Sequence, residues 1–285
     1  MDPRDTPFNG RVAHVSLKGR VTAEQFVDGE WFRVAVPVAD LLTSPNGSRT
    51  RQLVYGQGFC VVDMSEGFAF GYALRDGYCG WVNAADFAVP GSLSNRTHRV
   101  IVPRAFGLPR PDVKATGQEV ELSFGSEVAL LNVEGDWARV PRNRGTNPSD
   151  MFLPATALAP VETSLTDPAA TAEFFLHTPY LWGGNSAFGI DCSGLVQAAL
   201  LASGQPCPGD SDQQEQQVGS AFPEGATVAR NDLIFWKGHV ALALDCDRII
   251  HANAHHMAVA IEPLADAKAR ILEAGGGEVT SIRRP

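Results

Sequence analysis

Two patterns of apolar and polar residues divide the chain into a front part and a rear part. Up to about residue 160, short apolar stretches alternate with turn residues, with almost no sustained helical periodicity. Runs of this kind, bounded by Gly, Pro, Asn and Asp, are typical of strands. The pattern covers residues 9–92 and recurs more compactly over residues 97–160, where Glu134–Trp137 has the composition of a hairpin turn. We therefore expect two small all-β barrels.

The pattern changes to helices and then strands after a linker at Ala159–Thr166. Asp167 and Pro168 predict a helix start, and the strongest helical periodicity lies over Ser193–Ser203, with Gly204 placed to end that helix. The elements expected besides this helix are a helix over Ala169–His177, strands over Leu233–Trp236, His239–Asp245, Arg248–Ala252 and Ala258–Glu262, a helix over Pro263–Glu273 and a strand near Glu278–Ile282. This order predicts an α+β domain over residues 165–285.

Composition and charge narrow the class of partner. The chain has 285 residues, of which 44% are hydrophobic, so it is too apolar for disorder and long enough for several cores. Its formal net charge of −9 argues against binding to a nucleic-acid backbone. The apolar run from Ile234 to Leu244 contains Lys237 and His239 and is shorter than the roughly 20 residues of a membrane span. We expect neither nucleic acid nor membrane as a partner, and the oligomeric state stays open.

Cellular location and cysteine use are linked expectations. Met1–Asp5 is polar and lacks the apolar core of a secretory signal, so we expect a cytoplasmic protein. The five cysteines are odd in number and widely spaced, which is not typical of a disulfide framework. A reducing compartment makes a bridge between Cys60 and Cys79 the less favoured alternative.

One cysteine and two histidines are the candidate catalytic residues. Cys192 lies at the start of the Ser193–Ser203 helix, where backbone amides and the helix dipole stabilise a thiolate and an oxyanion. His239 opens an apolar strand and is the candidate general base and acid. His251 follows 12 residues later, after a turn, so that two antiparallel strands present both rings on one face. Each residue alone is more often structural, but together they predict covalent acyl transfer.

A metal site is the competing interpretation of the rear histidines. Cys246, His251, His255 and His256 lie within eleven residues of one another. Strand alternation places His256 on the opposite face from His251 and His255, and no carboxylate or second cysteine completes a tetrahedral set. We expect no metal and no other cofactor.

Five short motifs in order resemble those of the NlpC family of bacterial cell-wall cysteine peptidases. They are Pro179–Gly184, Asp191–Leu195, Asn231–Trp236, Gly238–Val240 and Ile250–Ala252. The resemblance covers about residues 165–285 and implies a papain-like fold, with Cys192 as nucleophile, His239 as base and His251 as third polar member. It also implies that the hydroxyl of Tyr180 lines the site near the oxyanion.

The resemblance extends to a substrate class. The front barrels are similar to the bacterial SH3-like domains that precede this catalytic domain in muropeptide-recycling enzymes. Those relatives cleave the bond between γ-D-glutamate and a diamino acid, meso-diaminopimelate or lysine, in small peptidoglycan-derived peptides with a free N-terminal L-alanine. The resemblance therefore implies a cysteine endopeptidase of that specificity.

The implied substrate contacts come from both parts of the chain. Asp191 and Asp210 match the acidic positions that would face the ammonium group, and Ser193 could add a hydroxyl. Tyr78 fits a tyrosine of the first barrel that reaches over the cleft, and Gln57 stands at that barrel's acidic position, which is a departure from the family. Pro208-Gly209-Asp210 is a second departure, because the family has arginine at the middle position.

Two other functions stay open. One is a peptidoglycan-binding module of SH3-like domains with a passive C-terminal domain. The other is a thiol amidase or acyltransferase that acts on another acyl group, because a fold and a triad fix a reaction class more firmly than a substrate.

Overall fold

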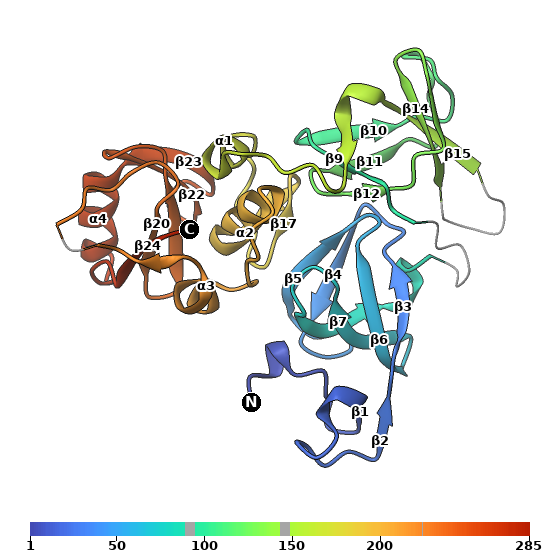
Figure 1. Cartoon of the computed structure of the whole chain (residues 1–285), viewed down its shortest axis with the longest axis horizontal. Coiled ribbons are helices and arrows are strands. Elements are labelled where there is room, and N and C mark those ends of the chain that lie inside the picture. Colours follow the sequence, from blue (N-terminus) through green and yellow to red (C-terminus); the bar gives the residue numbers. More distant parts are fainter. Residues whose placement is uncertain (89–94, 143–148, 224) are drawn as a thin grey trace. The chain divides into compact units, whose positions relative to one another are not determined.

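The computed structural model describes residues 1–88, 95–142, 149–223 and 225–285. It divides into two compact units, Met1–Thr163 and Ser164–Pro285, which are described separately (Figure 1). The expected end of the first barrel, at residue 92, lies outside the described residues. Among the described helices, none has both the length and the apolar character needed to cross a bilayer.

The first unit opens with two short parallel strands and a six-stranded antiparallel sheet in the order β3-β6-β7-β8-β4-β5. Leu41, Leu53 and Phe59 are fully buried at the centre of its core. The strands are β1 (Val12–His14), β2 (Gln25–Val27), β3 (Glu30–Arg33), β4 (Val38–Leu42), β5 (Arg49–Val54), β6 (Gly58–Ser65), β7 (Phe68–Ala73) and β8 (Cys79–Asn83).

A closed barrel, which the sequence predicts here, is not what the described residues form. β3 and β5 are the two edges of the sheet, and no strand ladder joins them. Single hydrogen bonds approach closure instead: Val34 donates its N–H to the Gln57 carbonyl at 3.1 Å, and its own carbonyl accepts from Gly56 at 2.8 Å. Pro37, which has no N–H to donate, directly precedes β4, and its carbonyl accepts from the Tyr55 N–H at 3.1 Å.

The rest of the first unit forms three small antiparallel sheets, β10-β11, β12-β9-β16 and β13-β14-β15, around a second core that contains Leu122, Val140 and Leu153. The predicted hairpin turn is confirmed, since Glu134 pairs with Trp137 across two residues. The strands are β9 (His98–Val100), β10 (Arg104–Gly107), β11 (Val120–Ser123), β12 (Glu127–Val128), β13 (Asn132–Glu134), β14 (Trp137–Arg142), β15 (Ser149–Pro154) and β16 (Leu158–Pro160). The front part is thus β-rich, as predicted.

The second unit is α+β, as the sequence predicts. Its main sheet is antiparallel, in the order β19-β24-β20-β21-β22-β23, and a two-stranded sheet, β17-β18, precedes the longest apolar helix. The elements are α1 (Pro168–Glu173), β17 (Asn185–Ser186), β18 (Gly189–Ile190), α2 (Cys192–Ala202), α3 (Ser211–Gln217), β19 (Ser220–Ala221), β20 (Leu233–Trp236), β21 (His239–Ala243), β22 (Arg248–Asn253), β23 (Ala258–Pro263), α4 (Leu264–Glu273) and β24 (Ser281–Arg284).

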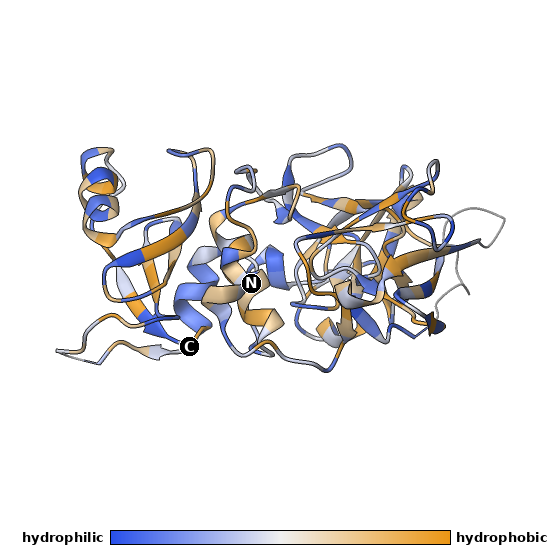
Figure 2. Ribbon diagram, turned by 90° about the horizontal axis from the view of Figure 1, so that it is seen from above, coloured by the Kyte–Doolittle hydropathy of each residue, from blue (hydrophilic) through white to orange (hydrophobic). Residues whose placement is uncertain are grey.

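Helices cover both faces of the main sheet (Figure 1). α1 and α2 pack against β21 and β22. On the other face, Ile234, Ala241 and Ile249 form a core with Leu264 and Ala267 of α4. Figure 2 shows that α4 carries both hydrophilic and hydrophobic residues along its length, as expected for a helix with one buried side. Strand alternation puts the side chains of His239 and His251 on this α4 face.

Candidate active site

The start of α2 is held by one carboxylate. Asp191 caps the helix: its Oδ1 accepts from the Gly194 N–H at 2.7 Å and from the Ser193 hydroxyl at 3.1 Å. Its Oδ2 accepts from the Gly183 N–H at 2.9 Å. Cys192 is thereby fixed as the first residue of α2, buried at 7% exposure. The partial positive charge at this helix end favours a thiolate there.

Close backbone packing explains the glycine at position 194. A Cβ atom on Gly194 would lie 2.4 Å from the carbonyl oxygen of Gly184, closer than any real contact. The loop before β17 therefore lies directly against the first turn of α2. Glycine is required at position 194, because any side chain there would push the loop away from the start of α2, where the thiol lies.

The two histidines meet on neighbouring strands. His239 Nε2 and His251 Nδ1 are 2.8 Å apart, and His251 Nε2 lies 2.6 Å from Oε1 of Glu262 on β23. The same carboxylate oxygen also accepts from Arg270 of α4. The His251 side chain is fully buried, so these contacts account for both of its ring nitrogens.

The Glu262 carboxylate determines which nitrogen donates in each hydrogen bond between His239, His251 and Glu262. An ionised Glu262 only accepts, so the facing His251 Nε2 carries a proton. Neutral His251 then accepts at Nδ1 and requires a proton on His239 Nε2. The remaining nitrogen of His239, Nδ1, is left with a lone pair. A chain of two histidines and one carboxylate thus leaves His239 in the tautomer of a general base.

Burial and charge keep this chain in the matching protonation states. Burial, together with His251 and Arg270, lowers the pKa of His239 to about 3. Burial also lowers the pKa of His251, although Glu262 acts against it. Burial alone would raise the pKa of Glu262, but hydrogen bonds from His251 and Arg270 outweigh it and bring that pKa to about 2. At neutral pH both rings are uncharged and the carboxylate is ionised.

Tyr180 lies in the electrostatic field of the α2 start. Burial and the nearby Cys192 and Asp191 raise the pKa of its hydroxyl to about 12. Its backbone is fixed by a hydrogen bond to the carbonyl of Met257 at 2.9 Å and by a bridge to Ile190. The phenol therefore stays protonated at neutral pH and can donate to a developing oxyanion.

Comparison with known protein families agrees with this geometry. A family model described as the NlpC/P60 family matches residues 177–270. These residues form an NlpC/P60 cysteine-peptidase domain. A second model, described as the bacterial dipeptidyl-peptidase Sh3 domain, matches residues 41–87. The chain therefore combines an N-terminal SH3-type region with a C-terminal NlpC/P60 domain.

Individual relatives share both regions. A gamma-D-glutamyl-L-lysine dipeptidyl-peptidase of Bacillus subtilis is 29% identical over 245 residues, which are 81% of this chain and 68% of that protein. A protein of the same name from Bacillus cereus is 27% identical over 215 residues, 67% of this chain and 61% of that protein. The crystal structure of an NlpC/P60 family protein from Bacillus cereus has the same fold, with a TM-score of 0.76 at 23% identity over 90% of this chain and 99% of that one.

Two further predicted contacts lie beside the nucleophile in the NlpC/P60 domain. Ser193 is buried and its hydroxyl donates to Asp191. Gln214 of α3 donates to the carbonyls of Ser193 and Pro208, each at 2.9 Å, which holds the segment of Asp210 against the α2 start. Asp210 is the residue before α3, but its side chain does not cap that helix. That these side chains bind substrate stays a prediction.

Tyr78 and Gln57, the two substrate contacts predicted in the first unit, each pack or form hydrogen bonds within that unit. Tyr78 is 4% exposed and belongs to the core of the six-stranded sheet. Gln57 uses its side-chain oxygen to accept from the Val54 N–H at 3.0 Å and from Arg75 at 3.1 Å. An amide oxygen can accept these two hydrogen bonds as well as a carboxylate oxygen can, so glutamine fits this turn although the family has an acidic residue here. A role of either residue toward substrate stays a prediction.

Glu262 and Arg270 are the site residues that the sequence analysis missed. In the register of β22 and β23, Glu262 pairs with Ile249 and Ala260 pairs with His251. Glu262 therefore lies on the same face as His251, one step along the strand. Strand alternation indicates this only when the register between Ala258–Glu262 and the strand of His251 is known. Arg270 required knowledge of how α4 packs.

A metal is not needed to explain the polar groups here. Among the described residues, His251, His256 and Glu262 bring three possible ligand atoms within 4.8 Å of one another. Both nitrogens of His251 are already in hydrogen bonds, and Arg270 is bound to Glu262. A cation would have to compete with that guanidinium. The expected absence of a metal stays a prediction.

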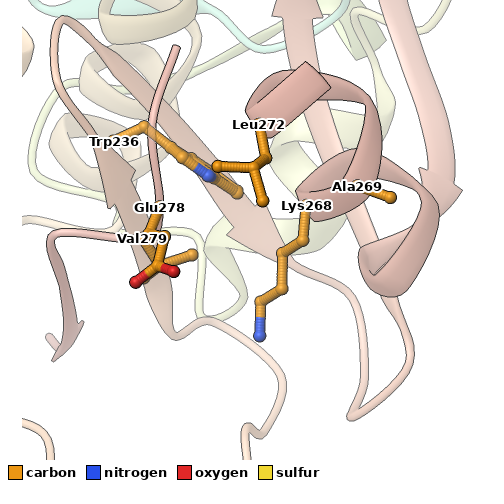
Figure 3. Close-up of a pocket in the computed structure, with 6 residues that line it drawn as sticks. All are labelled: Trp236, Lys268, Ala269, Leu272, Glu278 and Val279. Atoms are coloured by element: carbon orange, nitrogen blue, oxygen red, sulfur yellow. The ribbon is translucent and has the colours of Figure 1, made fainter. Parts of the chain in front are cut away.

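Two cavities lie on either side of the chain at Trp236. One, of about 450 Å³, borders His239 and His251. The other, of about 350 Å³, is shown in Figure 3, where Lys268 and Leu272 of α4 face Trp236 and the segment of Glu278 and Val279. Of these two cavities, the first borders His239 and His251 and the second does not.

Proposed function

We propose that this protein is a cysteine endopeptidase that hydrolyses the bond between γ-D-glutamate and a diamino acid, lysine or meso-diaminopimelate, in peptidoglycan-derived peptides with a free N-terminal L-alanine. The observation that carries the reaction class is the hydrogen-bonded chain from His239 through His251 to Glu262, in the domain that also contains Cys192 at a helix start. The names of the Bacillus relatives support the scissile bond.

The reaction proceeds in two steps. In the first, His239 takes the thiol proton of Cys192, and the sulfur attacks the γ-carbonyl carbon of D-glutamate. The tetrahedral intermediate collapses when His239 gives that proton to the amine of the diamino acid, which leaves. In the second, His239 takes a proton from water, the hydroxide attacks the thioester, and the proton returns to the sulfur as the acid departs.

The polar groups around the α2 start have separate roles in this proposal. Tyr180 donates to the oxyanion together with first-turn amides of α2. Asp191 and Asp210 provide negative charge for the L-alanine ammonium, and the Ser193 hydroxyl supports Asp191. Asp191 accepts hydrogen bonds from Gly183, Ser193 and Gly194, which hold its carboxylate at the start of α2.

A matched pair of peptides tests the proposal. L-Ala-γ-D-Glu-L-Lys should be cleaved to L-Ala-D-Glu and lysine, whereas the N-acetylated peptide, which lacks the ammonium, should react at least about tenfold more slowly, because a buried carboxylate loses its charged partner. The measurement is kcat/KM by chromatography of the products. Equal rates on both peptides would contradict recognition of the free amine, and no cleavage of either would contradict the proposed bond.

Asp210→Asn gives a second test of the ammonium contact. Asparagine keeps the shape and removes the charge, so KM for the free peptide should rise about tenfold. The rate on the N-acetylated peptide should be unchanged. A variant that loses activity equally on both peptides would show that Asp210 is structural.

A further inference from the structure

The cavity of about 450 Å³ beside the catalytic histidines has a distinctive lining. Its walls come from the ends of β20, β21 and β22 and from the last turns of α4. They include Trp236, Lys237 and His239 from the β20–β21 hairpin, Asn253 from β22 and Arg270 from α4. Any group that occupies this space lies against the ring that handles the transferred proton.

Three residues of this lining have buried N–H groups that meet no acceptor among the described residues. They are Nε1 of Trp236, Nδ2 of Asn253 and Nε of Arg270. Trp236 and Asn253 are only 2% and 6% exposed. The orientation of the Asn253 amide is fixed, because its oxygen accepts from the backbone N–H of His256 at 2.8 Å. Buried donors are nearly always paired, so the residues that line this cavity carry N–H groups that an acceptor bound there would satisfy.

The charges around the cavity favour an anionic acceptor. Lys237, His255 and Arg270 line it. Glu262 contacts two of the lining residues, His251 and, through Nη2, Arg270, and Nε of Arg270 has no acceptor among the described residues. A carboxylate presents two oxygens with several lone pairs and can accept from several N–H donors.

We propose that this cavity binds the carboxylate of the residue that the reaction releases, so that the enzyme prefers peptides whose diamino acid has a free α-carboxylate. The inference rests on the proposed function, because the released residue is there a diamino acid. His239 protonates the leaving amine, and the α-carboxylate is two bonds from that nitrogen. A leaving group that contacts His239 therefore carries its carboxylate into the adjoining space.

A second matched pair of peptides tests this site. L-Ala-γ-D-Glu-L-Lys and its C-terminal carboxamide share the same scissile bond and the same N-terminus. The wild-type enzyme should cleave the free acid with a kcat/KM about tenfold or more higher, because hydrogen bonds to a charged acceptor are the stronger ones. Free lysine should also inhibit more strongly than lysinamide.

Two substitutions should remove this preference. Asn253→Asp keeps the oxygen that binds His256 and replaces the donor by a repelling carboxylate, and Lys237→Met removes an exposed charge. Each should lower kcat/KM for the free acid and leave the rate on the carboxamide near that of the wild type, so that the ratio approaches one. Lys268→Met is the matched control, because Lys268 lines the other cavity, and it should keep the wild-type ratio.

The outcomes separate this inference from the proposed function. Equal cleavage of acid and carboxamide by the wild type overturns the carboxylate site and leaves the proposed function standing. An unchanged ratio in both Asn253→Asp and Lys237→Met overturns it as well. Failure to cleave either peptide overturns the proposed function and this inference together.

Discussion

At the scale of single residues, one carboxylate sets the state of the catalytic base. Glu262 accepts from His251, His251 accepts from His239, and Nδ1 of His239 keeps its lone pair. His251 is therefore the middle member of this hydrogen-bonded chain, and Glu262 is its last member. Arg270 holds the carboxylate ionised, since it contributes to the low pKa of Glu262.

Glu262→Gln should disturb this order. A neutral amide can donate to His251 Nε2 and so favours the opposite tautomer of both rings. We expect kcat/KM to fall about 10–100-fold, the range found when a hydrogen-bond partner of a functional histidine is removed. The ring nitrogens should change their protonation pattern in ¹⁵N NMR spectra.

The conservative Glu262→Asp should restore part of the activity and the wild-type tautomer. Glu273→Gln, an exposed position at the end of α4, is the matched control. Lost activity with an unchanged tautomer would show that Glu262 acts through stability alone.

The pH dependence of stability follows from the same residues. The pKa of His239 is about 3 in the folded protein against 6.5 ordinarily, so the unfolded chain takes up a proton that the folded site does not. Stability is therefore complete above about pH 6.5 and decreases as the pH falls, by at most about 1.4 kcal/mol per pH unit for this residue. Glu262, with a pKa of about 2 against 4.5, adds a further loss below pH 4.5.

His239→Gln should flatten this dependence. Urea unfolding of the NlpC/P60 domain within the full chain, followed between pH 7 and pH 4.5, should show a smaller loss of stability in the variant than in the wild type. Parallel curves would contradict a depressed pKa at His239.

At the scale of elements, the packing of the loop at Gly184 against the first turn of α2 positions the thiol. Gly194→Ala forces a Cβ atom into the Gly184 carbonyl. We expect the free energy of unfolding to fall by about 1–3 kcal/mol and kcat to fall as well, because the start of α2 must move. Denaturant unfolding and steady-state rates measure the two effects. Wild-type stability and activity would contradict the tight contact.

The sequence predicts the elements that bury apolar residues and misses those that do not. The helix over Ser193–Ser203 and the strand Leu233–Trp236 are observed with bounds equal or nearly equal to the prediction. α3 has the sequence Ser-Asp-Gln-Gln-Glu-Gln-Gln, which has no apolar period, and its buried Gln213 and Gln214 make it part of the core. The helix expected over Ala169–His177 ends at Glu173, where the chain turns toward a left-handed His177.

The candidate site likewise contains residues that the sequence predicts and residues that it misses. Cys192, His239 and His251 could be selected because each begins or occupies an apolar element in a recognisable motif. Glu262 and Arg270 could not, because their role depends on strand register and on the packing of α4, and neither is local in the sequence. The expectation of closed barrels was wrong for the six-stranded sheet, because the apolar pattern indicates strands but not the hydrogen-bonded ladders between them.

At the scale of the whole molecule, separate cores predict separate unfolding. Leu122 lies in a core of the first unit and Ile234 in a core of the second, and both are fully buried. Truncation of either to alanine should cost about 2–5 kcal/mol. In calorimetry of the full chain, Leu122→Ala and Ile234→Ala should each lower a different transition. One transition lowered by both substitutions would contradict independent cores.

The proposed reaction is tested most directly by identifying the bond that is cut and the thiol that cuts it. L-Ala-γ-D-Glu-L-Lys-D-Ala is incubated with the wild-type protein and with Cys192→Ala, and the products are identified by mass spectrometry. The wild type should release only L-Ala-D-Glu and L-Lys-D-Ala, while folded Cys192→Ala should release neither. Cleavage at another bond, or turnover by Cys192→Ala near the wild-type rate, would contradict the proposed reaction.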